Sequence, residues 1–223
     1  MQSNPIVQGK IVKQTDRDIL NSTLIVQGKI IRKYELPYDE IDELNTLFEK
    51  EKDKLESFSK RLAGNIKTEL KVNDLLTRTS IINSIYKCMQ DCTLQNSKLT
   101  HLPINESIKD YHISDAWIND MKDGEWNPPH IHHVDRLGPS GWSTVLFLRT
   151  PKMIKEDEPH KKHLNGKLSF TDERGENSIT VDPKVGDFYI FGAGHQHFVM
   201  PLQLENKNEI RRSLSFNYKI IYK

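Results

Sequence analysis

Three residues with the types and spacing of a metal site lie in the second half of the chain. His133 and Asp135 are separated by one residue, and His197 follows much later. A His-x-Asp pair with a distant histidine is typical of the 2-His-1-carboxylate triad, which binds non-haem Fe(II) and leaves coordination positions open. Residues i and i+2 of a strand point to the same face, so one strand can present both His133 and Asp135 to one ion. The pattern predicts His133, Asp135 and His197 as iron ligands.

A second pair of histidines in the same cluster offers an alternative. His130 and His132 have the opposite strand phase to His133 and Asp135. If His130 and His132 face the metal, His133 and Asp135 point away from it, unless a β-bulge turns Asp135 back. We favour His133 and Asp135, because a carboxylate reduces the charge on a ferrous centre. His130 and His132 remain the alternative first pair.

The last predicted strand carries polar residues that suit an anion beside the metal. Arg211, Ser213 and Ser215 alternate along residues 211–222 and therefore share one face. A guanidinium binds a carboxylate through two parallel charge-assisted hydrogen bonds, and a hydroxyl adds a third. This arrangement suits the distal carboxylate of 2-oxoglutarate, whose other end would chelate the iron. Arg212 has the opposite parity, and we expect it to point outward as a surface residue.

Together these residues indicate an Fe(II)- and 2-oxoglutarate-dependent oxygenase. Its co-substrates would be 2-oxoglutarate and O₂. The protein would hold the iron ligands, the co-substrate and the target in line, so no catalytic residue beyond the iron ligands is required.

Helical periodicity dominates the chain before about residue 105. Apolar residues recur three, four and seven apart between residues 41 and 62, as one face of a helix requires. A second helical segment is predicted through Ile66 and Leu70, and a third from Ile81 to Met89. Residues 36–104 are therefore expected to form a helical support region.

After about residue 105 the chain alternates between strand-forming runs and turn signals, including the predicted turn at Asn127-Pro128-Pro129. Many short strands favour a double-stranded β-helix, the jelly-roll of cupin-like proteins, with the metal on its inner face. The predicted fold class is α+β, with the β-helix core at 105–223. The predicted strands are 111–118, 142–149, 167–171, 178–181, 187–191, 197–202 and 211–222.

The first 35 residues contain a duplicated segment. Ile6–Ile11 and Ile25–Ile30 both read IVQGKI. Two copies are too few for a solenoid. We expect residues 1–35 to form an N-terminal β-ribbon within one compact domain.

Composition excludes several classes of partner. The chain has 32 Lys and Arg against 31 Asp and Glu, a net charge of +1, so no overall field attracts nucleic acid or an anionic membrane. No apolar run approaches the roughly 18 residues of a membrane span, and the N-terminus lacks the features of a signal peptide. Cys88 and Cys92 are expected to be buried small residues. We expect a soluble cytoplasmic protein that acts on a small molecule or a peptide; its oligomeric state is not specified.

Several motifs resemble the 2-oxoglutarate/Fe(II) oxygenases that are common in phage genomes. The likeness covers about residue 30 to the end and emphasises His130-x-His132 as the first ligands. The motifs lie at residues 126–132, 143–151, 186–191, 197–201 and 211–217.

The chain is also similar to prolyl 4-hydroxylases. His133-Val134-Asp135 has their spacing to the following strand, and Arg211 with Ser215 sits like their co-substrate clamp. Where those enzymes often present a tyrosine hydroxyl, this chain offers Phe147. The resemblance implies a hydroxylase that couples oxidative decarboxylation of 2-oxoglutarate to C–H oxidation, with a prolyl side chain of a peptide as one candidate target.

Two other functions fit the same residues. One is a metal cupin enzyme that does not use 2-oxoglutarate, with His130, His132 and His197 as ligands. The other is a non-catalytic, virion-associated β-domain with a vestigial site. The charged segment 155–163 is either a solvated hairpin tip or a lid over the substrate.

Overall fold

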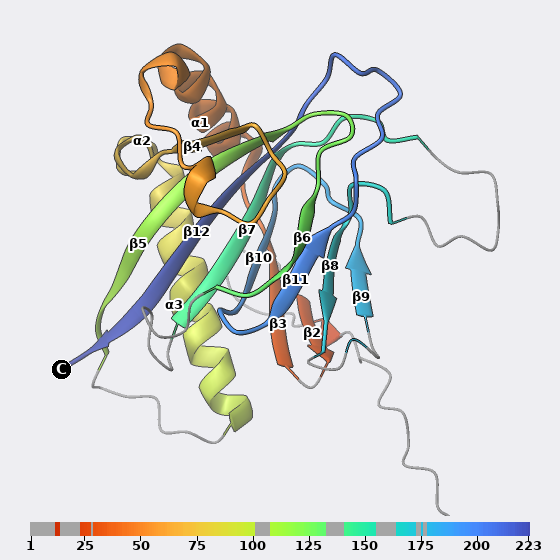
Figure 1. The fold of residues 1–223 in the computed structure, drawn as a ribbon. Coiled ribbons are helices and arrows are strands. Elements are labelled where there is room, and N and C mark those ends of the chain that lie inside the picture. Colours follow the sequence, from red (N-terminus) through yellow and green to blue (C-terminus); the bar gives the residue numbers. More distant parts are fainter. Residues whose placement is uncertain are drawn as a thin grey trace, which may run out of the picture.

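A computed structural model describes residues 12–13, 23–27, 29–100, 108–132, 141–154, 164–172, 175 and 178–223. Two antiparallel sheets face each other in these residues (Figure 1). The larger has eight strands in the order β1-β2-β3-β10-β7-β12-β5-β4, and the smaller has four in the order β6-β11-β8-β9. The strands are β1 (Val12–Lys13), β2 (Thr23–Gln27), β3 (Lys29–Glu35), β4 (Thr68–Lys71), β5 (Ile108–Met121), β6 (Asn127–His130), β7 (Gly141–Arg149), β8 (Leu168–Thr171), β9 (Ser178–Val181), β10 (Asp187–Gly192), β11 (Gln196–Val199) and β12 (Arg211–Tyr222).

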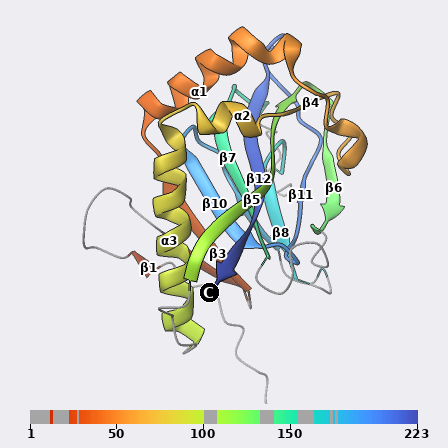
Figure 2. The ribbon, with the colours of Figure 1, turned by 90° about the vertical axis from the view of Figure 1, so that its left-hand side faces the viewer.

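The helices cover the outer face of the larger sheet, on the side opposite the smaller sheet (Figure 2). Asp39 and Glu40 in the first turn and Lys50 in the last turn complement the helix dipole of the first helix, which begins after Pro37. The helices are α1 (Tyr38–Glu51), α2 (Asn73–Thr77) and α3 (Ile81–Thr100), with short 3₁₀ turns at Lys52–Lys54 and Ser59–Arg61.

Strand alternation divides the buried residues into two layers. On β12, Leu214 and Phe216 pack beneath the helices, whereas Ser213 and Ser215 line a cavity between the sheets. On β7, Leu146 joins the helix-side layer and Phe147 the layer between the sheets. Because successive side chains point to opposite faces, each central strand contributes to both layers. This parity fixes which residues can reach the cavity.

The jelly-roll prediction is confirmed. The predicted strands 178–181 and 211–222 coincide with β9 and β12, and the others overlap an observed strand. The long strand β12 lies between β5 and β7 in the centre of the larger sheet. The proposed division at residues 35 and 104 stays a prediction. β3 pairs with both β2 and β10, which attaches this part of the expected ribbon to the sheet. The first copy of the repeat lies outside the described residues.

Two helix predictions were wrong. The first helix ends at Glu51 instead of continuing to Leu62. The second segment, through Ile66 and Leu70, forms strand β4, which pairs with β5. Two apolar residues four apart fit both a helical and a two-residue period, so this spacing did not distinguish the two.

The turn predicted at Asn127-Pro128-Pro129 was also wrong, because these residues begin strand β6. Proline fixes an extended backbone for itself and for the residue before it. It cannot donate a ladder hydrogen bond, so it is tolerated on an edge strand. β6 is such an edge strand of the smaller sheet.

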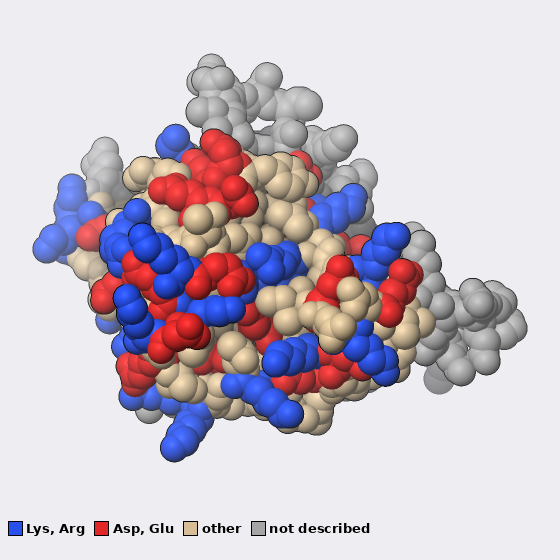
Figure 3. Space-filling model, turned by 90° about the horizontal axis from the view of Figure 1, so that it is seen from above, with Lys and Arg blue, Asp and Glu red and all other residues tan. Residues whose placement is uncertain are grey.

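The surface carries charges of both signs, and the two cysteines are buried. Lys and Arg side chains are interspersed with Asp and Glu over the face seen in Figure 3. Cys88 and Cys92 are free and buried in α3, as predicted. No described helix is both long enough and apolar enough to cross a membrane.

Candidate functional site

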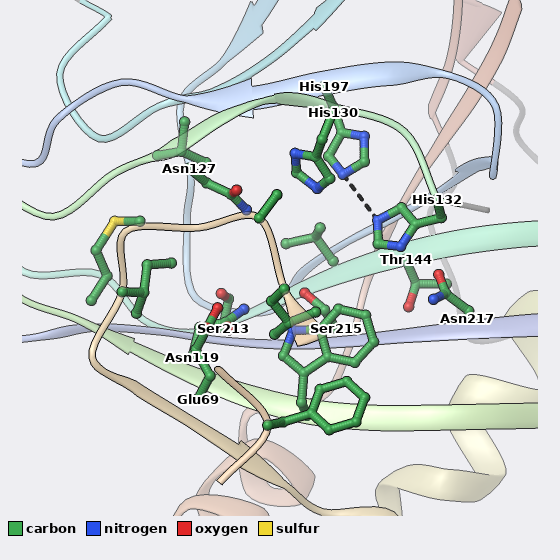
Figure 4. A pocket seen from close by; sticks show the side chains of 18 of the residues that line it. Glu69, Asn119, Asn127, His130, His132, Thr144, His197, Ser213, Ser215 and Asn217 are labelled. Carbon is green, nitrogen blue, oxygen red and sulfur yellow. Dashed lines mark hydrogen bonds between the residues drawn. The ribbon is translucent and has the colours of Figure 1, made fainter. Parts of the chain in front are cut away.

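A cavity of about 330 Å³ lies between the two sheets. Its volume falls within the range of about 300–1,000 Å³ that is usual for small-molecule sites. Its walls combine apolar side chains with a similar number of polar and charged ones. Arg211 is among the polar residues of the wall. Others that face one another across the cavity include Glu69, Asn119, His130, His132, His197, Ser213 and Ser215 (Figure 4).

Three histidines converge on one side of this cavity. His130 ends β6, His132 follows it by two residues, and His197 lies on β11 opposite His130 in the strand register. One potential ligand atom from each lies within 4.8 Å of the others. The Nε2 atoms of His132 and His197 are 3.3 Å apart (Figure 4). This arrangement can place three imidazole nitrogens around a single ion.

Backbone carbonyls orient two of these rings. The Nδ1 atom of His130 lies 2.7 Å from the carbonyl oxygen of Pro128, and that of His197 lies 2.9 Å from the carbonyl oxygen of His195. A carbonyl only accepts hydrogen bonds, so Nδ1 carries the proton in both rings and Nε2 keeps its lone pair. Such a fixed tautomer is what metal-ligating histidines commonly show.

Burial favours the neutral form of His130 and His197. It lowers the pKa of His197 well below the ordinary value, and the neighbouring His130 and His132 lower it further. Burial also lowers the pKa of His130. Neutral imidazole is the form that binds a metal, and it suits iron among the first-row transition metals. The donor set therefore fits an Fe(II) ion.

The predicted ligands fall into two groups. The structure brings His197 together with the alternative pair, His130 and His132. His133 and Asp135 lie outside the described residues, so their role stays a prediction. The same holds for the charged segment 155–163.

Arg211 lies on the same cavity and is almost fully buried. Its Nη1 donates a hydrogen bond to the carbonyl of Gly166, and the guanidinium lies over the ring of Phe147, 5.4 Å from its centre. Its Nε has no partner, and no carboxylate of the described residues pairs with it. Burial lowers the pKa of Arg211 to about 10, which still leaves it charged at neutral pH.

An unpaired buried cation is costly, and an anionic ligand removes that cost. Ser213 and Ser215 follow Arg211 on the same face of β12, as the alternation predicted, and both line the cavity. Arg211 and these hydroxyls therefore form a surface that fits a carboxylate.

The turn at Gly166 helps to position Arg211. Gly166 has φ +58°, a left-handed conformation that glycine adopts without strain. A Cβ there would also have to displace the side-chain ends of Leu202 and Met153. The turn carries the carbonyl that accepts the hydrogen bond from Arg211.

The expectation for Arg212 was wrong. Its side chain is fully buried on the helix side of β12, where it donates hydrogen bonds to Asp120 and Glu49 and lies over Phe48. The alternation of side chains along the strand correctly assigned Arg212 to the face opposite Arg211. That face is covered by α1 rather than by solvent.

Three cavity residues were not identified from the sequence. Glu69 on β4 is the register partner of Asn119 on β5, and Asn119 in turn pairs with Ser213 on β12. Trp117 lies two residues from Asn119, with its ring 6.0 Å from that of His132. Burial raises the pKa of Glu69 to about 7, and the charge of Glu125 adds to this rise. The predicted strand 111–118 included Trp117 but ended before Asn119, and the incorrect helix prediction concealed Glu69.

Replacing Glu69 with glutamine is expected to stabilise the protein at about pH 8 by roughly 1–3 kcal/mol, but not at about pH 4. The folded-state pKa of about 7 lies above the ordinary 4.5. Between these values the folded protein binds more protons than the unfolded chain, so stability falls as pH rises. Glutamine cannot ionise and avoids this loss. Urea unfolding at both pH values measures the effect, with exposed Glu56→Gln as the control. An equal change at both pH values would contradict it.

Comparisons with known proteins agree with this geometry. Residues 115–217 match the family model described as "Putative 2OG-Fe(II) oxygenase". A Pseudomonas putida prolyl-4-hydroxylase superposes with TM-score 0.54 at 16% identity, covering 86% of this chain and 92% of that one. The viral collagen prolyl hydroxylase of Paramecium Bursaria Chlorella virus-1, solved as a 2OG complex, gives 0.52 at 14%, covering 87% and 98%.

A third similar structure is a Trichoplax adhaerens prolyl hydroxylase in complex with a hypoxia inducible factor oxygen degradation domain peptide fragment. It has TM-score 0.52 at 12% identity and covers 85% of this chain and 83% of that one. No curated protein matches the sequence. The structural likeness establishes the double-stranded β-helix fold, and the family match covers His130, His132, His197 and Arg211. Residues 115–217 therefore resemble the 2OG-Fe(II) oxygenases, dioxygenases that use Fe(II) with 2-oxoglutarate and O₂ as co-substrates.

Proposed function

We propose that the protein is a hydroxylase that couples oxidative decarboxylation of 2-oxoglutarate to oxidation of a substrate C–H bond. The observation that carries this proposal is the shared cavity. A cluster of three imidazoles and a buried guanidinium without a carboxylate partner among the described residues both line it. Fe(II) with 2-oxoglutarate and O₂ would supply the oxidising chemistry at this place.

Within this proposal His130, His132 and His197 hold the iron. Three ligands leave coordination positions open for a chelating co-substrate and O₂. The carbonyls of Pro128 and His195 keep the Nε2 atoms of His130 and His197 available. Three neutral ligands leave the ferrous charge uncompensated, and the dianion 2-oxoglutarate would balance it.

Arg211 binds the distal carboxylate of 2-oxoglutarate, and Ser213 and Ser215 donate further hydrogen bonds to it. The Gly166 carbonyl and the Phe147 ring hold the guanidinium in place before the co-substrate arrives. Preorganisation of this kind reduces the entropy lost on binding. The apolar wall around these groups limits the access of water and strengthens the ion pair.

A peptidyl group is the proposed target. The similar solved structures are described as prolyl hydroxylases, and one contains a bound peptide fragment. In this chain Ile131 lines the cavity and is 54% exposed, and Trp126 lies nearby in sequence and is 37% exposed. Exposed apolar side chains beside a cavity favour contact with a peptide over contact with water.

Replacing His132 with alanine is expected to weaken Fe(II) binding by about tenfold or more, because one of three ligands is lost. The measurement is anaerobic Fe(II) titration in the presence of 2-oxoglutarate, followed by the visible absorption of the chelate. His112→Ala, at an exposed position of β5, is the matched control.

The same titration tests the competing ligand set. If His133→Ala or Asp135→Ala loses Fe(II) while His132→Ala retains it, the iron is held by His133 and Asp135 instead. If Fe(II)-loaded protein consumes no 2-oxoglutarate with any candidate peptide and does not bind it, the hydroxylase proposal is wrong.

A further inference from the structure

A group of polar atoms on the cavity wall opposite the histidines has no hydrogen-bond partner among the described residues. Glu69 is 1% exposed and its Oε2 is unpaired, and Asn119 is 8% exposed with Oδ1 unpaired. The two residues are register partners on β4 and β5. Figure 4 shows them close to Ser213 and across the cavity from the three histidines.

Buried unpaired acceptors are uncommon because each loses its hydrogen bonds to water without replacement. The Glu69 carboxyl has a hydrogen bond with Ser59, but Oε2 has no partner among the described residues. An ionised carboxylate can only accept hydrogen bonds, so the group that pairs with Oε2 must be a donor. A positively charged donor compensates best, because it also balances the buried charge. The wall therefore favours a ligand whose cationic group enters the cavity.

The surroundings of Glu69 favour the same ligand. Trp117 lines the cavity on the next strand, two residues from Asn119, the register partner of Glu69. An aromatic face attracts a cation through its electron-rich ring. The nearest lining cation, Arg61, is exposed and lies over the ring of Phe58, where water screens it.

Arg211 lies on β12, and its guanidinium reaches Gly166 before β8 rather than the β4 edge that carries Glu69. The cavity thus has a cationic wall around Arg211 and an acidic wall around Glu69. Separate walls of opposite charge suit two ligands of opposite charge. The first would be the dicarboxylate co-substrate, and the second a cationic substrate.

We propose that Glu69, together with Asn119, binds an ammonium or guanidinium group of the primary substrate, so that the enzyme oxidises a molecule bearing a basic side chain. This inference rests on the proposed hydroxylase function, since the basic group would share the cavity with 2-oxoglutarate. An ammonium can donate to both Glu69 and Asn119 and face the ring of Trp117. A bound cation also favours the ionised form of the Glu69 carboxyl.

Matched pairs of small probes test this subsite. N-acetyl-lysine amide is compared with N-acetyl-norleucine amide, and N-acetyl-arginine amide with N-acetyl-citrulline amide. Each is titrated calorimetrically into the anaerobic full-length protein loaded with Fe(II), with and without 2-oxoglutarate. In the wild-type protein at least one cationic probe is expected to bind about tenfold or more tightly than its neutral partner, as a charge-assisted hydrogen bond predicts.

In Glu69→Gln the cationic and neutral probes are expected to bind about equally, since the amide keeps the shape of the carboxylate but loses its charge. Glu56→Gln removes the same charge from an exposed position and is expected to keep the preference. Equal binding of cationic and neutral probes by the wild-type protein overturns the inference without any variant. A preference that survives in folded Glu69→Gln also overturns it.

The two proposals fail in different ways. If 2-oxoglutarate binds but cationic probes are not preferred, the basic substrate is excluded and the hydroxylase function stands. If cationic probes are preferred in a Glu69-dependent way but 2-oxoglutarate does not bind, the cation subsite stands and the hydroxylase function is overturned.

Discussion

Replacing Arg211 with methionine is expected to weaken the binding of 2-oxoglutarate by roughly 30- to 5,000-fold, the range that follows from losing one partner of a buried charge pair at about 2–5 kcal/mol. Methionine approximates the aliphatic part of arginine but cannot balance the distal carboxylate. The reason for a large effect is burial: the guanidinium is 3% exposed and almost no solvent screens it. Calorimetric titration of the anaerobic Fe(II)-loaded protein with 2-oxoglutarate gives the affinity.

The fold of the Arg211 variant should remain intact. Arg211 has no carboxylate partner among the described residues, so its removal leaves no unpaired acid there. The free energy of unfolding should therefore fall by no more than about 1 kcal/mol, the size of the lost hydrogen bond to Gly166. Arg211→Lys should recover only part of the affinity, because an ammonium lacks the planar pair of donors.

The same variant separates the oxygenase from its rivals. A cupin enzyme that does not use 2-oxoglutarate would keep its metal-dependent activity in Arg211→Met. A non-catalytic β-domain would bind no 2-oxoglutarate even in the wild-type form. Unchanged 2-oxoglutarate affinity in the variant would show that the co-substrate lies elsewhere.

Strand parity made the core of the site predictable from sequence. The alternation on β12 assigned Arg211, Ser213 and Ser215 to one face, and the structure places all three on the cavity. A two-residue period is a local geometric property, so it needs no knowledge of the neighbouring strands. Which part of the protein packs against each face depends on the tertiary structure. The alternation could not show that α1 covers the face of Arg212, so we expected this residue in solvent.

The choice of metal ligands could not be made from sequence for a related reason. His130 and His132 have one strand phase and His133 and Asp135 the other, so both pairs satisfy the alternation rule. Which pair faces inward depends on how β6 pairs with β11. In the structure His130 is opposite His197, with a register irregularity further along the pair between His197 and Val199.

Glu69 illustrates a third limit. An isolated glutamate between a threonine and a leucine carries no sequence signal of function, and the periodicity there was interpreted as helical. Its position matters only because β4 adds to the edge of the larger sheet and pairs with β5. Long-range pairing of this kind is set by the tertiary structure and not by local propensity.

Replacing Arg212 with methionine is expected to lower the free energy of unfolding by about 3–5 kcal/mol. Arg212 is fully buried, and its Nε and Nη2 donate hydrogen bonds of 2.6 Å to the two oxygens of Asp120. Methionine would leave the buried Asp120 carboxylate without its cation. The contact of 2.8 Å between Arg212 and Glu49, which attaches α1 to the larger sheet, would also be lost.

Urea unfolding of Arg212→Met beside Arg149→Met measures this difference. Arg149 is 49% exposed and lies 3.7 Å from the same Glu49, so its replacement should cost less than about 1 kcal/mol. The double variant Arg212→Met/Asp120→Leu should recover part of the loss, because an apolar pair leaves no buried charge unpaired. Equal stability of Arg212→Met and Arg149→Met would contradict the burial argument. The contrast with Arg211 follows from the strand itself: two adjacent arginines face opposite layers, so one governs ligand affinity and the other stability.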